Sequence, residues 1–209
     1  MVNLTIRIPR WLDEMFVWPV MIYRKIKHGC VFRRIYLGEG LYTVVDPGDY
    51  YRYGHMKWSL GAHRSKAYAI CGVKQKDGSI RTAGLHRIIK KPGKGRVADH
   101  WNNNSLDNRS SNLRSATRAQ NCCNRPKSRF KKTSKYVGVS YEKGQNRWAV
   151  KLRYKGKRYW GGGYKTEIEA AKAHDKIAKK YQGEYAKLNF PPKDSGVPCL
   201  PRRIFGLKD

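Results

Sequence analysis

Acidic residues are scarce in this sequence. Its 209 residues include 15 Asp and Glu against 45 Lys and Arg, which leaves a formal net charge of +30. An excess of this size repels itself in a compact chain, so a polyanion is the expected partner, nucleic acid before an anionic membrane. The sequence also lacks any run of about 20 apolar residues, which argues against a membrane-spanning helix.

Paired cysteines and a secretion signal are missing as well. The five cysteines include no C-x-x-C pair, and two of them are adjacent. This spacing excludes a zinc site and a disulfide framework and favours a reducing, cytoplasmic location. Residues 11–23 are largely apolar, but two acids and a proline interrupt them and no small-residue cleavage pattern follows. They predict a short helix or packed arm.

The few acids that remain are unevenly placed. Residues 81–133 carry 14 basic and 2 acidic side chains, yet they retain Asp99 and Asp107. A carboxylate within a surface that attracts phosphate is out of place unless a positive charge lies on it. Asp99 is therefore a candidate metal ligand on charge alone.

Short segments rich in β-branched and aromatic residues predict strands. These segments are residues 41–45, 67–73, 80–89, 136–141, 147–154 and 157–164. Residues 115–121 predict a short helix. A longer helix is predicted to begin at Thr166, where Glu169 completes a capping box. After Pro192 the chain is rich in proline, glycine and charge, which predicts a loose tail.

Residues 147–155 alternate between two kinds of side chain. One set is apolar or aromatic: Trp148, Val150, Leu152 and Tyr154. The other set is basic: Arg147, Lys151, Arg153 and Lys155. One face of this strand is expected to pack on a helix and the other to meet DNA, because a sheet laid in the major groove reaches base edges and phosphates together.

A polar cluster of another kind lies upstream. Asp99 and His100 end a predicted strand, an asparagine-rich loop follows, and Asn121 ends the predicted helix. A carboxylate and an amide oxygen suit a hard cation such as Mg²⁺ or Mn²⁺. A neighbouring imidazole can accept a proton from an attacking water, while the metal stabilises the departing oxygen. This combination predicts a metal-dependent nuclease.

Residues 35–123 resemble the HNH homing endonucleases. The resemblance is carried by the D-H…D-N-R-x-x-N-L-R…Q-N pattern of residues 99–121 and by a V-D-x-x-D-Y turn at residues 45–50. It implies a ββα-metal nuclease core that hydrolyses DNA phosphodiesters, in an enzyme of a bacterial or phage mobile element.

The same resemblance implies roles for individual residues. Asp99 and Asn121 would bind one divalent metal ion, His100 would be the general base, and Asn112 would pin the loop that orients it. Three further residues could contact phosphate or bind the loop internally, and the sequence leaves both alternatives open: Arg87, Arg109 and Arg114.

Residues 134–191 resemble the APETALA2/ethylene-response-factor DNA-binding domain of plants. The motifs are Y-V-G-V at 136–139, R-W at 147–148, R-Y-W-G at 158–161, E-A-A at 169–171 and A-K-L-N-F-P at 186–191. The resemblance implies a three-stranded antiparallel sheet packed on one helix, with Arg153, Arg158 and Trp160 at DNA-contacting positions. Val137 and Ser140 stand where plant domains carry base-reading arginines, so a different sequence preference is expected.

Together these patterns predict an α+β chain that acts as a monomeric endonuclease on double-stranded DNA, with no membrane partner. The predicted parts are an N-terminal extension (1–34), a nuclease domain (35–121), a basic linker (122–133), a DNA-binding domain (134–191) and a tail (192–209). One alternative is a non-catalytic DNA-binding regulator that keeps a nuclease scaffold. Others are an RNA-binding protein and membrane association through residues 11–23.

Overall fold

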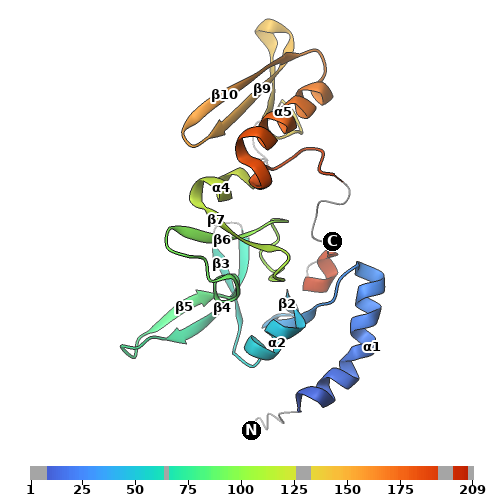
Figure 1. Cartoon of the computed structure of the whole chain (residues 1–209), viewed down its shortest axis with the longest axis vertical. Coiled ribbons are helices and arrows are strands. Elements are labelled where there is room, and N and C mark those ends of the chain that lie inside the picture. Colours follow the sequence, from blue (N-terminus) through green and yellow to red (C-terminus); the bar gives the residue numbers. More distant parts are fainter. Residues whose placement is uncertain (1–8, 64–65, 126–132, 193–199, 207–209) are drawn as a thin grey trace. The chain divides into compact units, whose positions relative to one another are not determined.

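The computed structural model describes residues 9–63, 66–125, 133–192 and 200–206. The chain forms two compact units (Figure 1). The first unit consists of residues 1–91, 104–113 and 197–209, and the second of residues 92–103 and 114–196. Both units combine helices with small sheets of two or three strands, so the α+β class is confirmed.

The first unit begins with a long helix and continues with short strands and helices. Its elements are α1 (Arg10–His28), β1 (Arg33–Gly38), β2 (Leu41–Val45), α2 (Pro47–Tyr53), β3 (Ser59–His63), β4 (Lys66–Lys74), β5 (Ile80–Gly84), α3 (Leu85–Lys90) and the short 3-10 helix η3 (Arg202–Phe205). Strands β1 and β2 form one antiparallel sheet, and β3, β4 and β5 form another. The predicted helix or arm at residues 11–23 is a 19-residue helix that continues through Pro19.

The core of the first unit includes residues from the end of the chain. Phe32, Val44 and Leu85 are fully buried, and Leu200 and Phe205 pack in the same cluster. The prediction of a loose tail is therefore wrong for residues 200–206, because their apolar side chains complete this core. Residues 193–199 of that tail lie outside the described residues.

The strand predicted over residues 80–89 is half wrong. β5 ends at Gly84, and α3 takes up the remaining residues. Leu85 is fully buried, and Ile88 and Ile89 pack against the same core. These three positions follow helical spacing, so tertiary burial selects a helix despite their strand propensity.

The second unit contains two sheets and two main helices. Its elements are β6 (Arg96–His100), β7 (Leu113–Thr117), α4 (Arg118–Cys123), β8 (Val139–Glu142), η1 (Lys143–Gln145), β9 (Arg147–Tyr154), β10 (Lys157–Tyr164), α5 (Glu167–Gln182) and η2 (Gly183–Tyr185). Strands β6 and β7 pair with each other, and the second sheet has the order β10-β9-β8. The order β6, β7, α4 is that of a ββα unit, although this order alone does not make a nuclease core.

Several predicted boundaries in this unit shift by a few residues. The helix predicted over residues 115–121 begins only at Arg118, because Thr117 and Gln120 form a capping box at its start. Cys122 and Cys123 belong to this helix and not to a linker, and residues 126–132 of the predicted linker lie outside the described residues. The strand predicted over 136–141 is β8, at residues 139–142.

Helix α5 packs against one face of the sheet β8–β9–β10 (Figure 1). The predicted capping box is confirmed, since Thr166 accepts from the Glu169 amide and Glu169 accepts from the Thr166 amide. Ala170, Ala171 and Ala178 are fully buried where the helix meets the strands. Because these residues are small, the helix lies close against the sheet. The opposite face of the sheet stays exposed.

Within the described parts of the chain, no helix has the length and apolar content needed to cross a lipid bilayer.

Candidate nucleic-acid interface

The exposed face of β8–β9–β10 brings together five residues that the sequence predicted to contact DNA. They are Arg147, Lys151 and Arg153 from β9, and Arg158 and Trp160 from β10. The antiparallel register sets Arg158 opposite Arg153 and Trp160 opposite Lys151. Opposite residues of an antiparallel pair point to the same face, so these side chains form one surface, which we call the basic face.

Two arginines of the basic face are direct cross-strand neighbours. Arg153 and Arg158 are paired in the register, and both are exposed. Opposite positions in an antiparallel ladder lie about 4.5–5.5 Å apart between Cβ atoms, and like charges there destabilise the sheet. A pair of this kind gains stability when an anion, such as a phosphate, comes between the two guanidinium groups.

Trp160 lies beside these cations with its ring open to solvent. It is 52% exposed, whereas most tryptophan side chains in folded proteins are largely buried. The Arg147 guanidinium lies 5.4 Å and the Lys151 ammonium 5.3 Å from its ring centroid. The ring therefore holds two cations in place and leaves an apolar surface for contact with a base or sugar.

One acid shares the basic face. Glu142 of β8 accepts from the Lys151 ammonium at 2.8 Å and from the Arg147 guanidinium at 3.5 Å. The hydrogen bond from Lys151 is the main reason that the pKa of the Glu142 carboxyl lies below its ordinary value. Glu142 thus orients two cations in the free protein and competes with any phosphate that approaches them.

The opposite side of the sheet is built for close packing on α5. A Cβ placed on Gly161 would lie 2.5 Å from Ile177 Cδ1 and 2.6 Å from Val150 Cγ1. Glycine is therefore required where β10 crosses the helix. The predicted alternation along β9 is confirmed, since Val150 and Leu152 are buried while Lys151 and Arg153 are exposed.

His174 of α5 fixes the entry to β8. It is 2% exposed and packs inside the domain. Gly138 has φ +71°, and a Cβ there would lie 2.1 Å from the imidazole. Asp175 accepts from the Asn189 amide at 2.9 Å, and Asn189 in turn accepts from the Val137 amide at 2.7 Å. This chain of bonds ties the start of β8 to α5 and to the segment that follows the helix.

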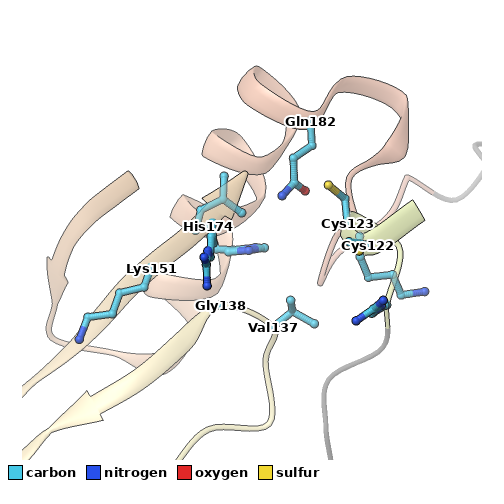
Figure 2. A pocket seen from close by; sticks show the side chains of 11 residues that line it. Cys122, Cys123, Val137, Gly138, Lys151, His174 and Gln182 are labelled. Carbon is cyan, nitrogen blue, oxygen red and sulfur yellow. The ribbon is translucent and has the colours of Figure 1, made fainter. Parts of the chain in front are cut away.

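A cavity of about 190 Å³ opens beside β9. Figure 2 shows Cys123 and Gln182 directed into it, whereas Lys151 extends away along the sheet. Its lining includes four cations: Arg125, Lys151, Arg153 and Lys187. Two of these also belong to the basic face, so the hollow borders that face.

The residues predicted to form a metal site are arranged differently. Asp99 and His100 are both 6% exposed at the end of β6. The Arg114 guanidinium donates to Asp99 Oδ2 at 2.9 Å, and the Asn124 amide donates to both Asp99 oxygens at 3.1 and 3.3 Å. Asn124 also donates to the His100 carbonyl at 2.9 Å.

This donor set does not fit a divalent cation. A metal needs several oxygen ligands around it, whereas Asp99 is surrounded by N–H donors and is neutralised by Arg114. Among the residues that the structure describes, no three His, Cys, Asp or Glu side chains come together as a metal site would require. The Mg²⁺ or Mn²⁺ ion stays a prediction that these residues do not favour.

The asparagines show what the sequence pattern missed. Asn124, one helical turn beyond Asn121, is the residue that contacts Asp99 and His100. The sequence offered Asn121 because it matches the family motif, and nothing in the motif marks Asn124. Asn112 donates to the Asp107 carbonyl at 2.7 Å, a hydrogen bond within its own loop, and its role in orienting His100 stays a prediction.

Two of the three arginines whose roles were open bind inside the protein. Arg109 is 1% exposed and pairs with Asp107 at 2.6 Å. Arg114 pairs with Asp99, as described above, and its side chain is 16% exposed. Arg87 is exposed on α3, and its contact with phosphate stays a prediction.

Comparisons with known proteins identify the sheet and its helix. Residues 134–184 match the family model of the AP2 domain. APETALA2-like protein 2 of Oryza sativa subsp. japonica is 38% identical over 71 residues, which cover 33% of this chain and 16% of that protein. Ethylene-responsive transcription factor ERF024 of Arabidopsis thaliana is 38% identical over 66 residues, which cover 31% of this chain and 36% of that protein.

A third relative has a similar sequence identity. AP2-like ethylene-responsive transcription factor TOE2 of Arabidopsis thaliana is 37% identical over 59 residues, which cover 28% of this chain and 12% of that protein. The chain therefore spans between 12% and 36% of the lengths of these relatives. The predicted APETALA2 resemblance is confirmed for residues 134–184.

The prediction of a metal-dependent endonuclease is wrong. The matching family is the AP2 domain, and the matching relatives carry the names of transcription factors and APETALA2-like proteins, not of enzymes. The reaction to which Asp99, His100, Asn112 and Asn121 were assigned falls with it. These relatives are plant proteins, so they give no support to a bacterial or phage origin.

Proposed function

We propose that this chain is a non-catalytic DNA-binding regulator that holds double-stranded DNA against the basic face. The observation that carries the proposal is the exposed Arg153–Arg158 pair, set beside Trp160 in an AP2 domain. Two like charges held together by a sheet need an external anion, and a duplex supplies phosphates on both sides of a groove. The whole-chain charge of +30 adds a long-range attraction toward the same partner.

The shape of the basic face favours DNA over double-stranded RNA. The major groove of B-form DNA is wide enough for a β-ribbon or helix, whereas the major groove of A-form RNA is deep and narrow. Contact with DNA is assigned to β9 and β10 in this proposal. The β8 position Ser140 carries no long donor, and Val137 precedes that strand.

The pair β6–β7 has a supporting role in this proposal. Arg114 of β7 donates to the Glu184 carbonyl at 2.8 Å, and its guanidinium lies 4.5 Å from the centroid of the Tyr185 ring. Tyr185 donates to the Ser115 carbonyl at 2.9 Å. These contacts join β7 to the segment that follows α5, so Arg114 helps to hold β6–β7 against the domain that carries the basic face.

The test is a binding titration of the full chain with a labelled duplex by fluorescence anisotropy. The variant Arg153→Gln/Arg158→Gln should weaken binding about 30-fold or more, since two arginine contacts to the duplex, each worth about 1–3 kcal/mol, together contribute at least about 2 kcal/mol. A matched control removes two exposed lysines of α5, which packs on the opposite face: Lys172→Gln/Lys176→Gln. Equal losses in both variants would contradict a specific role for the basic face.

Two further assays separate DNA binding from the alternatives of RNA binding and DNA cleavage. Competition by an RNA duplex of matched sequence should be weaker than competition by DNA. Incubation of a supercoiled plasmid with the protein and Mg²⁺ or Mn²⁺ should leave it uncut. Cleavage that disappears in the Asp99→Ala variant would restore the endonuclease and remove the proposal.

A further inference from the structure

Among the described residues, helix α1 contacts the rest of the first unit along one edge. Asp13 accepts from Arg33 at 2.8 Å and from the Tyr51 hydroxyl at 2.7 Å. Farther along, Arg24 donates to the Phe32 carbonyl at 2.5 Å. No residue of the helix is buried, although it has 19 residues. The remaining circumference therefore faces away from its own unit.

That outward surface is apolar and continuous. The positions of its central stripe differ by 4, 3, 4 and 4 residues, which places them on one helix face: Trp11, Met15, Trp18, Ile22 and Ile26. Their exposed fractions are 69%, 57%, 62%, 38% and 81%. Phe16 and Tyr23, 69% and 54% exposed, widen the stripe along one side. We call these seven residues the apolar stripe.

The area of the apolar stripe is that of an interface. A buried aromatic side chain covers about 150–250 Å², so the exposed parts of Trp11, Phe16 and Trp18 alone supply roughly 300–500 Å². The four other side chains bring the total toward the roughly 800 Å² per partner of a standard interface. The largest apolar patch on an ordinary monomer is about 300–600 Å² and is often functional.

The charges beside the stripe indicate what covers it. Glu14 and Lys25 are 11 residues apart, close to three helical turns, so they lie on the same edge of the stripe about 16 Å from each other. When two copies of such a helix pack antiparallel about a twofold axis, equivalent edges meet. Glu14 of each copy then faces Lys25 of the other, and the acidic first half of the helix lies along the basic second half.

We infer that the apolar stripe is a self-association surface, which joins two copies of this chain through antiparallel α1 helices. Twofold, self-complementary contacts are the commonest form of oligomer, and Trp, Phe, Tyr and Met are the side chains enriched at interface centres. The dimer carries two basic faces, which goes beyond the proposed function of a single chain. It also departs from the monomer that the sequence led us to expect.

An anionic membrane is the other partner that an aromatic, partly basic helix can meet. The charge distribution favours a second copy, because Glu14 lies beside the stripe in the first half of the helix and would approach the lipid phosphates. The two partners also respond oppositely to salt. Screening of a +30 chain relieves repulsion between copies, whereas it weakens attraction to anionic lipid.

The experiment is sedimentation velocity of the full chain without DNA, over a concentration series at low and high NaCl. A concentration-dependent dimer is expected, and it should strengthen as salt rises. Trp18→Asp, at the centre of the stripe, should raise the dimer dissociation constant about 30-fold or more. Ile168→Asp is the matched control, since Ile168 is an exposed apolar residue of α5, and it should leave the dimer unchanged.

A charge exchange tests the antiparallel orientation. Glu14→Lys should weaken the dimer, and adding Lys25→Glu in the same chain should restore it, while circular dichroism checks that the helix is intact. A monomer under all conditions overturns the inference, as does a dimer that Trp18→Asp leaves intact or a double exchange that fails to restore it. Binding of a monomeric chain to phosphatidylserine–phosphatidylcholine vesicles, lost in Trp18→Asp, would overturn it in favour of lipid. None of these outcomes depends on DNA binding.

Discussion

The basic face and the Asp99 cluster differ in how their charges are balanced. On the basic face two of the four cations, Arg147 and Lys151, pair with one acid, Glu142, while Arg153 and Arg158 are exposed beside them. In the Asp99 cluster a buried carboxylate meets a guanidinium and an amide within the protein. Sequence motifs predicted a function for both regions, DNA binding for the first and DNA cleavage for the second. The charges distinguish the two regions, because only the basic face has cations that an external anion could neutralise.

The strongest test of this comparison removes the internal partner of Asp99. Arg114→Met should lower the free energy of unfolding by about 3–5 kcal/mol, because it leaves a buried carboxylate uncompensated. Urea denaturation measures the change, and adding Asp99→Asn should recover part of it. Arg87→Met, which alters an exposed arginine, should cost less than about 0.5 kcal/mol. Equal stability of the two arginine variants would show that the cluster is not a structural brace.

A second internally balanced pair gives a smaller effect with a defined pH dependence. The hydrogen bond from Arg33 lowers the pKa of the Asp13 carboxyl below its ordinary value. A lowered folded-state pKa means that the stabilisation is complete above the unfolded-state pKa, near pH 4, and is lost as pH falls through the folded value. Asp13→Asn should cost about 1.5 kcal/mol at pH 7 and almost nothing at strongly acidic pH.

The measurement for this pair is urea denaturation of both proteins over a series of pH values. A difference between wild type and Asp13→Asn that stays constant down to strongly acidic pH would contradict the assignment of this pair.

On the basic face, Trp160→Ala should weaken duplex binding about fivefold, because it removes an aromatic surface and the contacts that orient Arg147 and Lys151. Trp160→Phe should retain part of the affinity. Ile168→Ala removes an exposed apolar side chain from α5 instead and should leave anisotropy titrations unchanged. If Trp160→Ala binds as tightly as Ile168→Ala, the tryptophan does not take part in the interface.

The smallest expected effect has the opposite sign. Glu142→Gln should tighten DNA binding about two- to threefold, because the weak exposed ion pairs to Lys151 and Arg147 no longer compete with phosphate. Asp77→Asn changes the charge by the same amount in the first unit and serves as the control in the same titration. Weaker binding by Glu142→Gln would mean that Glu142 helps binding by orienting Lys151 more than it hinders binding by repelling the DNA phosphates.

Local patterns made the C-terminal sheet predictable. Alternation along residues 147–155 identified both faces of β9, and the Thr166–Glu169 capping box marked the start of α5. These signals depend on neighbours in sequence. The pairing of Arg153 with Arg158 then follows from a short turn between two strands.

Other features depend on contacts that are distant in sequence and could not be predicted this way. Asp99 is separated from Arg114 by 15 residues and from Asn124 by 25, and the HNH motif assigns neither contact. Leu200 and Phe205 pack in a core that is built mainly from the first part of the chain, although the composition of their segment predicts a loose tail. The HNH resemblance drew attention to Asp99, but it did not say which residues Asp99 contacts.

The salt dependence of DNA binding tests the central claim most directly. The logarithm of the association constant should fall linearly with the logarithm of salt concentration, by about 0.9 for each phosphate neutralised. Removal of two phosphate contacts in Arg153→Gln/Arg158→Gln should reduce this slope by roughly 1.8. Lys172→Gln/Lys176→Gln should keep the wild-type slope. Identical slopes for the wild type and the arginine variant would show that DNA lies elsewhere on the protein.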